Sequence, residues 1–133
     1  MTPKNNPLVV FDIDMTLTSE WYYEDNVATL RANLPLVQLA TLLADSGVSI
    51  VISTARPNRL RADSENWLQS VGVKFDALYM REDGDDRPDH YVKTEQALAI
   101  IEDFGRPSLW YDDNQDNCKV VRELGIPCVQ VMQ

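Results

Sequence analysis

The sequence predicts an α/β fold in which a doubly wound parallel sheet of about five strands carries helices on both faces. Two observations lead to this fold class. Apolar runs of strand length alternate with stretches of helical length along the chain, and helical connections imply parallel neighbouring strands. Polar side chains directly follow four of the apolar runs, which is typical of a sheet that binds a ligand at the carboxyl ends of its strands.

The first expected strand is the apolar run Leu8 to Phe11, which has the pattern of a strand buried on both faces. Residues 19–33 are rich in Trp, Tyr and acidic residues, and we expect an irregular segment or a short helix over the end of that strand. This segment is too short to form a separate domain, so one domain over residues 1–133 is expected.

The first long helix is expected to begin at Pro35, which suits a first helical turn, with Asn33 or Leu34 near the cap. A broad apolar face follows, and Gly47 ends the helix. The later elements obey the same rules, with a glycine after each helix. Their expected ranges are strand 48–53, helix 57–71, strand 75–80, helix 91–104, strand 108–111, helix 114–124 and strand 127–131.

Polar residues gather where the strands end, and their side chains should meet at one edge of the sheet. They are Asp12 and Asp14 after the first strand, Ser53, Thr54 and Arg56 after the second, Arg81 after the third, and Asp112 and Asp113 after the fourth. Each alone is compatible with a solvated loop. Together they indicate a divalent cation held by carboxylates beside an anion held by cations, and Mg²⁺ with a phosphate group fits both.

This set of residues suits phosphoryl transfer. One carboxylate of the first pair can attack phosphorus, and the second can protonate the leaving oxygen and then activate water. Lys93 could neutralise the nucleophile and the phosphate together, or it could be a plain surface lysine. The helix after the second strand is expected to begin near Thr54, so that its N-terminal amides face the anion.

Composition narrows the class of protein further. The net charge of −9 and the sequence pI of about 4.4 argue against broad, non-specific binding to a nucleic-acid backbone, but not against recognition of one terminal phosphate by local cations. No apolar run approaches the ~20 residues of a membrane span, and residues 1–7 are too polar for a signal peptide.

The two cysteines, Cys118 and Cys128, lack the spacing of metal ligands, so we expect reduced thiols and a cytoplasmic protein. No obligate protein partner is evident from the sequence.

An EF-hand calcium site is excluded, because the sixth and twelfth positions of such a loop, counted from Asp12, hold Leu17 and Tyr23 instead of Gly and Glu.

The polar residues at the strand ends, taken in order, resemble the four motifs of the haloacid dehalogenase (HAD) superfamily of phosphohydrolases. The matching residues are Asp12, Asp14 and Thr16, then Thr54, then Lys93, and finally Asp112 with Asp113. The resemblance implies the strand order 5-4-1-2-3 and, with so few residues to spare, a minimal cap or none.

By this resemblance Asp12 is the nucleophile and Asp14 the general acid and base, while Thr54 and Lys93 bind and stabilise the transferring phosphoryl group. The implied cofactor is Mg²⁺. Its ligands would be Asp12, the backbone carbonyl of Asp14 and one acid of the later pair, with Asp113 as the direct ligand and Asp112 in support. Asp116 would be a supporting partner or simply an acid favoured in the first turn of a helix.

The second half of the chain resembles more closely the 3′-phosphatase domain of bacteriophage polynucleotide kinase–phosphatase. The similarity covers 54–56, 81–93 and 111–113. It implies that Arg56, Arg81 and Lys93 bind phosphate or support the site and that Asp89 orients them. The sequence departs from this pattern at Met15, where glycine is usual, and in 19–33, which lacks an expected arginine; the 133 residues also contain no kinase P-loop.

Three functions remain open at this stage. The leading one is a Mg²⁺-dependent phosphatase of nucleic-acid 3′ ends or nucleotides, and the second is a phosphatase of small sugar or metabolite phosphates. The third is a phospho-receiver signalling domain. In receivers the acidic pair follows the first strand and the phosphoacceptor lies on the third, an order that differs here, and Asp14 would supply the acid and base that turnover needs. The aromatic cluster Trp21-Tyr22-Tyr23 could stack a base or could cover the edge of the core. His90 is interpreted as a helix-start residue.

Overall fold

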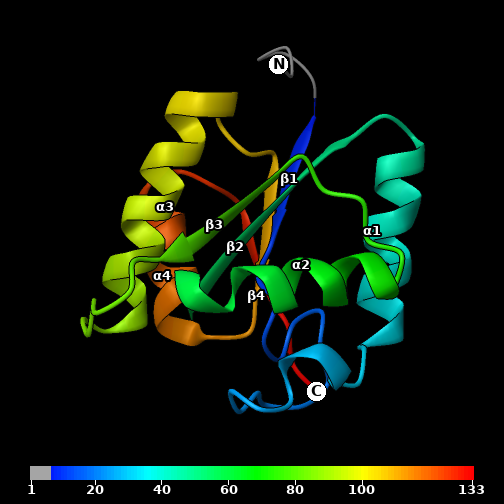
Figure 1. The fold of residues 1–133 in the computed structure, drawn as a ribbon. Coiled ribbons are helices and arrows are strands. Elements are labelled where there is room, and N and C mark those ends of the chain that lie inside the picture. The colour runs from blue at the N-terminus through cyan, green and yellow to red at the C-terminus, as the bar shows by residue number, and fades with distance from the viewer. Residues whose placement is uncertain (1–6) are drawn as a thin grey trace.

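The computed structural model describes residues 7–133 and shows a parallel five-stranded sheet in the order β3-β2-β1-β4-β5 (Figure 1). The predicted fold class and strand order are therefore confirmed. The strands are β1 (Leu8–Phe11), β2 (Ser49–Pro57), β3 (Ala77–Arg81), β4 (Leu109–Asp112) and β5 (Cys128–Gln130). The signal-peptide expectation rests largely on residues 1–6, which lie outside the described residues.

Four α-helices and two short 3₁₀ helices connect the described strands. They are η1 (Val27–Thr29), α1 (Leu34–Asp45), η2 (Asn58–Leu60), α2 (Arg61–Ser70), α3 (Asp89–Phe104) and α4 (Gln115–Glu123). Asn33 caps α1 with a proline in the first turn, and His90 lies in the first turn of α3, both as predicted. Within residues 7–133, no helix combines the length and the apolar character that crossing a bilayer requires.

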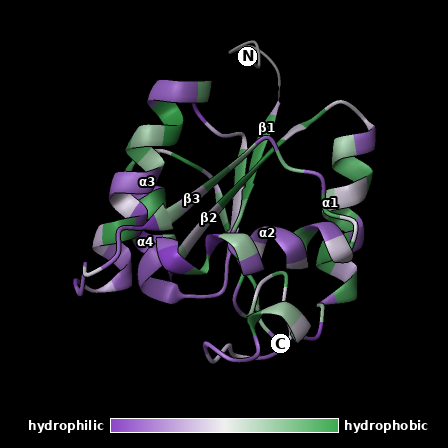
Figure 2. Cartoon of the chain, viewed as in Figure 1, coloured by the Kyte–Doolittle hydropathy of each residue, from purple (hydrophilic) through white to green (hydrophobic). Residues whose placement is uncertain are grey.

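The sheet is buried on both faces, and β1 shows why its sequence is apolar throughout. Val9 and Phe11 pack into a core with α1 and α2, whereas Leu8 and Val10 pack into a second core with α3 and α4. The two helical layers lie on opposite sides of the sheet in Figure 1, and Figure 2 shows hydrophobic residues in the central strands between them. This arrangement holds the strand ends rigidly at one edge of the sheet.

The segment between β1 and α1 is irregular with one short helix, as predicted. Its ends meet in an isolated antiparallel bridge between Thr18 and Ala32. The indole N–H of buried Trp67 donates to the carbonyl of Leu30 at 2.7 Å, which ties the segment to α2. The segment therefore forms a small cap held against the body of the fold.

The expected helix start near Thr54 is wrong. Strand β2 continues through Pro57, and α2 begins only at Arg61 after η2. Proline disfavours helical backbone at the residue before it, which here is Arg56. Pro57 itself is extended, with ψ at 149°. The extension pairs with β3 after a shift in register between Ser53 and Pro57. Helical amides therefore do not follow Thr54, and any anion at this edge must be bound by other groups.

Met15 occupies the position where the resemblance leads one to expect glycine, and it has a positive φ of 61°. A left-handed backbone costs a residue with a Cβ about 1–2 kcal/mol, a cost that glycine avoids. We expect Met15→Gly to be more stable than Met15→Ala by about 1 kcal/mol, because both lose the same contacts and only alanine keeps the strain. Urea unfolding of the two variants measures this difference, and an alanine variant of equal or greater stability would contradict it.

Candidate active site

Asp12 is the first residue beyond β1, and its backbone N–H donates to the carbonyl of Tyr111 at 2.9 Å. A tight turn follows, in which the amides of residues 16–18 all donate to the carbonyl of Ile13. This turn carries Thr16 back over the strand end, where its hydroxyl donates to Asp12 Oδ2 at 3.1 Å. The carboxylate of Asp12 is thereby fixed at the centre of the site, with only 6% of the residue exposed.

Lys93 is not a surface lysine. It is fully buried in the second turn of α3, and its Nζ lies 3.0 Å from Asp12 Oδ1 and 3.0 Å from Asp112 Oδ2. The ammonium also donates to the carbonyl of Ser53. Burial alone would lower the pKa of Lys93, but the carboxylates of Asp112 and Asp12 outweigh it and hold the pKa above its usual value. The lysine therefore brings a permanent positive charge to Asp12.

Three carboxylates converge beside this lysine. Asp12, Asp112 and Asp113 each offer an oxygen, and these oxygens all lie within 4.8 Å of one another. Burial raises the pKa of Asp12 well above its ordinary value, and Asp112 raises it further. Burial also raises the pKa of Asp113. Such crowding indicates a cation site, and the all-oxygen donor set suits a hard divalent cation such as Mg²⁺.

Asp14 lies apart from that group, because its carboxylate is held by Arg56. The Arg56 guanidinium donates to Asp14 Oδ1 at 2.7 Å and to Oδ2 at 3.0 Å, and its third nitrogen donates to the hydroxyl of Ser64 at 2.9 Å. Arg56 is 1% exposed, and its guanidinium carbon lies 4.9 Å from the centre of the Tyr22 ring. Arg56 thus orients the second acid, and the predicted Asp14 carbonyl ligand stays a prediction.

Thr54 is fully buried, and its hydroxyl accepts from the Arg56 N–H at 3.2 Å. Gln96, one turn beyond Lys93 on α3, holds the backbone around it by donating to the Thr54 carbonyl at 2.9 Å and accepting from the Ser53 hydroxyl. Sequence reasoning missed Gln96 and Ser64. The signal for Gln96 was its i,i+3 spacing from Lys93, which places both side chains on one helix face. The phosphoryl-binding role of Thr54 stays a prediction.

Arg81 lines the same cavity, but its guanidinium has partners within the protein. It donates to the carbonyls of Ala55, Asp85 and Arg87 and, at 2.6 Å, to the Asp89 carboxylate. Asp89 therefore orients Arg81, as the resemblance implies for its counterpart. In this state Arg81 holds the 82–88 loop against the end of β2, and direct binding of phosphate by Arg81 stays a prediction.

Asn117, and not Asp116, supports the acidic pair after β4. Its Nδ2 lies 3.3 Å from Asp112 Oδ1, while its Oδ1 is buried without a hydrogen-bond partner among the described residues. Asp116 is exposed in the first turn of α4, so its interpretation as an acid favoured at a helix start is the one the structure supports. Sequence reasoning missed Asn117 because spacing alone does not show which side of α4 faces the strand end.

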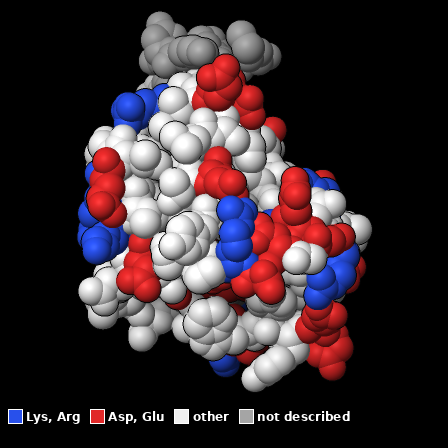
Figure 3. Space-filling model, turned by 90° about the vertical axis from the view of Figure 1, so that its left-hand side faces the viewer, with Lys and Arg blue, Asp and Glu red and all other residues white. Residues whose placement is uncertain are grey.

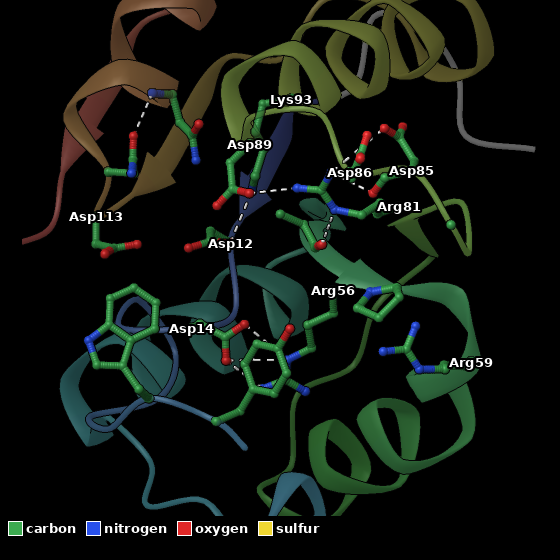
Figure 4. A pocket seen from close by; sticks show the side chains of 17 residues that line it. Asp12, Asp14, Arg56, Arg59, Arg81, Asp85, Asp86, Asp89, Lys93 and Asp113 are labelled. Carbon is green, nitrogen blue, oxygen red and sulfur yellow. Dashed lines mark hydrogen bonds and ion pairs between the residues drawn. The ribbon is translucent and has the colours of Figure 1, made fainter. Parts of the chain in front are cut away.

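A cavity of about 400 Å³ at the carboxyl ends of the strands is lined by Asp12, Asp14, Arg56, Arg81, Lys93 and Asp113, among others (Figure 4). Asp12, Asp14 and Asp113 lie on one side of the cavity, and Lys93, Arg56, Arg81 and Arg59 lie around it. Three further acids, Asp85, Asp86 and Asp89, line it near Arg81. The face drawn in Figure 3 shows Lys and Arg interspersed with Asp and Glu, without a broad basic surface. The site therefore suits an anionic group together with a cation.

The raised pKa of Asp12 predicts how metal and pH act on stability. Without metal, the carboxyl of Asp12 keeps its proton in the native state, whereas in the unfolded chain it loses this proton above about pH 4. The free energy of unfolding should therefore fall as the pH rises from about 4 to the native pKa of Asp12. Mg²⁺ bound to the acids removes this loss, because it favours their ionised form. We therefore expect Mg²⁺ to raise Tm more at about pH 8 than at about pH 5.

Thermal unfolding in Mg²⁺ and in chelator at both pH values measures that difference, and Asp113→Asn should shrink it. An equal effect of Mg²⁺ at both pH values would contradict the proposed link between the buried acids and the metal.

Comparison with known families supplies one match across nearly the whole chain. Residues 6–133 match the family described as the polynucleotide kinase PNKP phosphatase domain. Two solved structures of Pnkp1/Rnl/Hen1 complexes, one described as an RNA repair complex, contain a chain that is 26% identical. The TM-scores are 0.87 and 0.85, and each alignment covers 98% of this chain. It covers only 44% and 48% of those longer chains, so this chain spans less than half their length.

More distant structures share the fold. A D,D-heptose bisphosphate phosphatase from B. bronchiseptica, solved with magnesium and phosphate, is 14% identical with a TM-score of 0.68. The alignment covers 92% of this chain and 78% of that one. At this identity the likeness concerns the arrangement of strands and helices alone.

Proposed function

The chain belongs to the polynucleotide kinase PNKP phosphatase family and is a HAD phosphatase, and from this premise we propose that it removes the 3′-phosphate from nucleic-acid ends or nucleotides with the help of Mg²⁺. The observation that carries the proposal is the cavity in which Asp12 lies between the Lys93 ammonium and a second, arginine-held acid. The family match sets aside the phospho-receiver alternative.

The proposed reaction begins with attack of an Asp12 oxygen on phosphorus. A phosphorus–oxygen bond to Asp12 forms, the bond to the leaving oxygen breaks, and Asp14 gives that oxygen a proton. Asp14 then takes a proton from a water that attacks the aspartyl phosphate, which releases inorganic phosphate and frees Asp12. Arg56 holds Asp14 through three hydrogen bonds, which fix the orientation of this acid at the cavity.

The cations of the cavity balance the charge that this reaction brings in. Lys93, 3.0 Å from Asp12, lowers the repulsion between the attacking carboxylate and the phosphate. Asp12, Asp112 and Asp113 would hold the Mg²⁺, which when bound would supply further positive charge beside the phosphoryl oxygens. Thr54 and Arg81 complete the proposed phosphate site, with Asp89 holding Arg81 in place.

A nucleic-acid end is the proposed substrate for two reasons. The family match points to a polynucleotide phosphatase, and the likeness to a chain of an RNA repair complex supports the same class of substrate. The described cap is a small segment, and the cavity beneath it can admit the end of a larger molecule. A protein with a net charge of −9 should bind little of the polynucleotide backbone beyond that end.

Arg81→Lys tests the phosphate site and the substrate together. The variant keeps the charge but loses the planar fork, so it should lower kcat/KM for 3′-phosphorylated nucleotides about tenfold to a hundredfold. Steady-state phosphate release by wild type and variant is compared on 3′-nucleotides and on sugar phosphates. A wild type that prefers sugar phosphates would replace this function with that of a metabolite phosphatase, and an Arg81→Lys variant of unchanged activity would remove Arg81 from the site.

A further inference from the structure

Trp21 differs from the other two tryptophans of the chain. Trp67 and Trp110 are 2% and 0% exposed, whereas Trp21 is 60% exposed and lines the cavity together with Asp14 and Asp113. Leaving so large an apolar side chain in water forgoes the stabilisation that burial would give. Among residues 7–133 no hydrogen bond or ring contact engages Trp21, so its indole is free to meet a ligand that enters the cavity.

The neighbouring tyrosines are placed differently. Tyr22 is half buried and its ring already packs on the Arg56 guanidinium. Tyr23 is 71% exposed and does not line the cavity. Of the three aromatic residues in a row, Trp21 alone is both exposed and part of the cavity wall.

Contacts within the protein hold the segment on both sides of Trp21. Before it, the Glu20 carboxylate accepts from the Arg31 N–H at 2.9 Å, and the Ser19 N–H donates to the Arg31 carbonyl at 2.9 Å. After it, the Tyr22 ring rests on Arg56, and Glu24 forms an ion pair with Arg59 of η2. A ligand that stacks on Trp21 therefore pays little conformational entropy to order the segment.

We propose that Trp21 stacks on the base of the 3′-terminal nucleotide while its phosphate lies at Asp12. This inference rests on the proposed function and names the part of the substrate that the cap would recognise. A cavity of about 400 Å³ falls in the range of small-molecule sites and can hold more than a phosphate group. Because the protein is acidic, an uncharged stacking contact supplies affinity that attraction to the backbone cannot.

Stacking of one base on an aromatic side chain contributes about 1–3 kcal/mol, so Trp21→Ala should raise KM for a 3′-phosphorylated oligonucleotide about 5- to 150-fold. The kcat should change little, because the contact is the same before and during the reaction. Trp21→Phe should retain most of the affinity. Tyr23→Ala is the matched control, since it removes an exposed aromatic residue that does not line the cavity, and it should leave KM unchanged.

The decisive comparison uses a second oligonucleotide whose 3′-terminal residue carries the phosphate but no base. Trp21→Ala should act on this abasic substrate as well as wild type does. Equal losses on both substrates would mean that Trp21 only supports the cap, and no loss on either would mean that it contacts nothing; each result overturns the inference while leaving the proposed function intact. A wild type that prefers sugar phosphates overturns both.

Binding can be observed without turnover as well. In chelator, a purine 3′-nucleotide should quench the fluorescence of wild type but not of Trp21→Phe, whose remaining tryptophans are buried. Inorganic phosphate alone should quench neither. Quenching that persists in Trp21→Phe would place the base elsewhere and contradict the inference.

Discussion

Asp12→Asn is expected to abolish turnover while leaving the fold intact. The amide is nearly isosteric with the carboxylate, and its single oxygen can still accept from either Thr16 or Lys93, but it cannot attack phosphorus. Loss of the nucleophile should lower kcat by at least about a thousandfold, or more than ~4 kcal/mol of transition-state stabilisation. The measurement is the rate of phosphate release from a 3′-phosphorylated oligonucleotide under saturating substrate.

The fold of this variant should survive, because burial and the neighbouring acids disfavour a charge at Asp12 more than Lys93 favours it, and Lys93 keeps Asp112 as a partner. Burial and Asp112 raise its pKa, so removing its charge should not destabilise the metal-free protein. Asp116→Asn is the matched control, since it changes an exposed acid of α4 outside the cavity and should retain full activity. An Asp12→Asn enzyme with even a tenth of wild-type kcat would contradict a covalent mechanism at Asp12.

Lys93→Met is expected to have the second largest effect, on both activity and stability. The variant keeps the buried alkyl chain and removes the ammonium that lies 3.0 Å from Asp12 and 3.0 Å from Asp112. Removing the ammonium leaves the Asp112 carboxylate buried without its cation, and breaking a buried ion pair from one side typically costs about 3–5 kcal/mol. In chelator near neutral pH, the free energy of unfolding should therefore fall by roughly 3 kcal/mol, with kcat lower by a factor of about a thousand.

Mg²⁺ should restore much of the lost stability, since it binds the same acids. It should not restore the activity, which needs the Lys93 ammonium beside Asp12 in addition to the metal. Lys119→Met is the control, because it removes an exposed lysine of α4. Urea unfolding with and without Mg²⁺ separates the two effects. A Lys93→Met variant that is as stable in chelator as wild type would show that the buried ion pairs contribute nothing.

The sequence was sufficient to predict that the acids converge, because the rule behind this convergence is simple. Carboxyl ends of parallel strands meet at one edge, so Asp12 and Asp113 had to lie near each other despite 100 intervening residues. The apolar run of β1 was predicted with its observed bounds, Leu8–Phe11, because a strand buried on both faces tolerates no polar residue. These features depend on patterns that the chain displays locally.

The partners of the arginines could not be predicted in the same way. The sequence indicated that Arg56 and Arg81 would lie near the phosphate, but not that Arg56 holds Asp14 or that Arg81 binds three backbone carbonyls. Which acid an arginine reaches depends on the turn after Asp12 and on the register shift that extends β2. Neither feature has a local signature strong enough to compete with the helix pattern after Pro57.

The central claim, a phosphatase of nucleic-acid 3′ ends, is tested most directly by phosphate release from two oligonucleotides of the same sequence, one with a 3′-phosphate and one with a 5′-phosphate. In Mg²⁺ the wild-type protein should release phosphate from the 3′-phosphorylated strand at least about tenfold faster by kcat/KM, and chelator should stop the reaction. Equal rates on the two strands, or a preference for the 5′-phosphate, would contradict the claim.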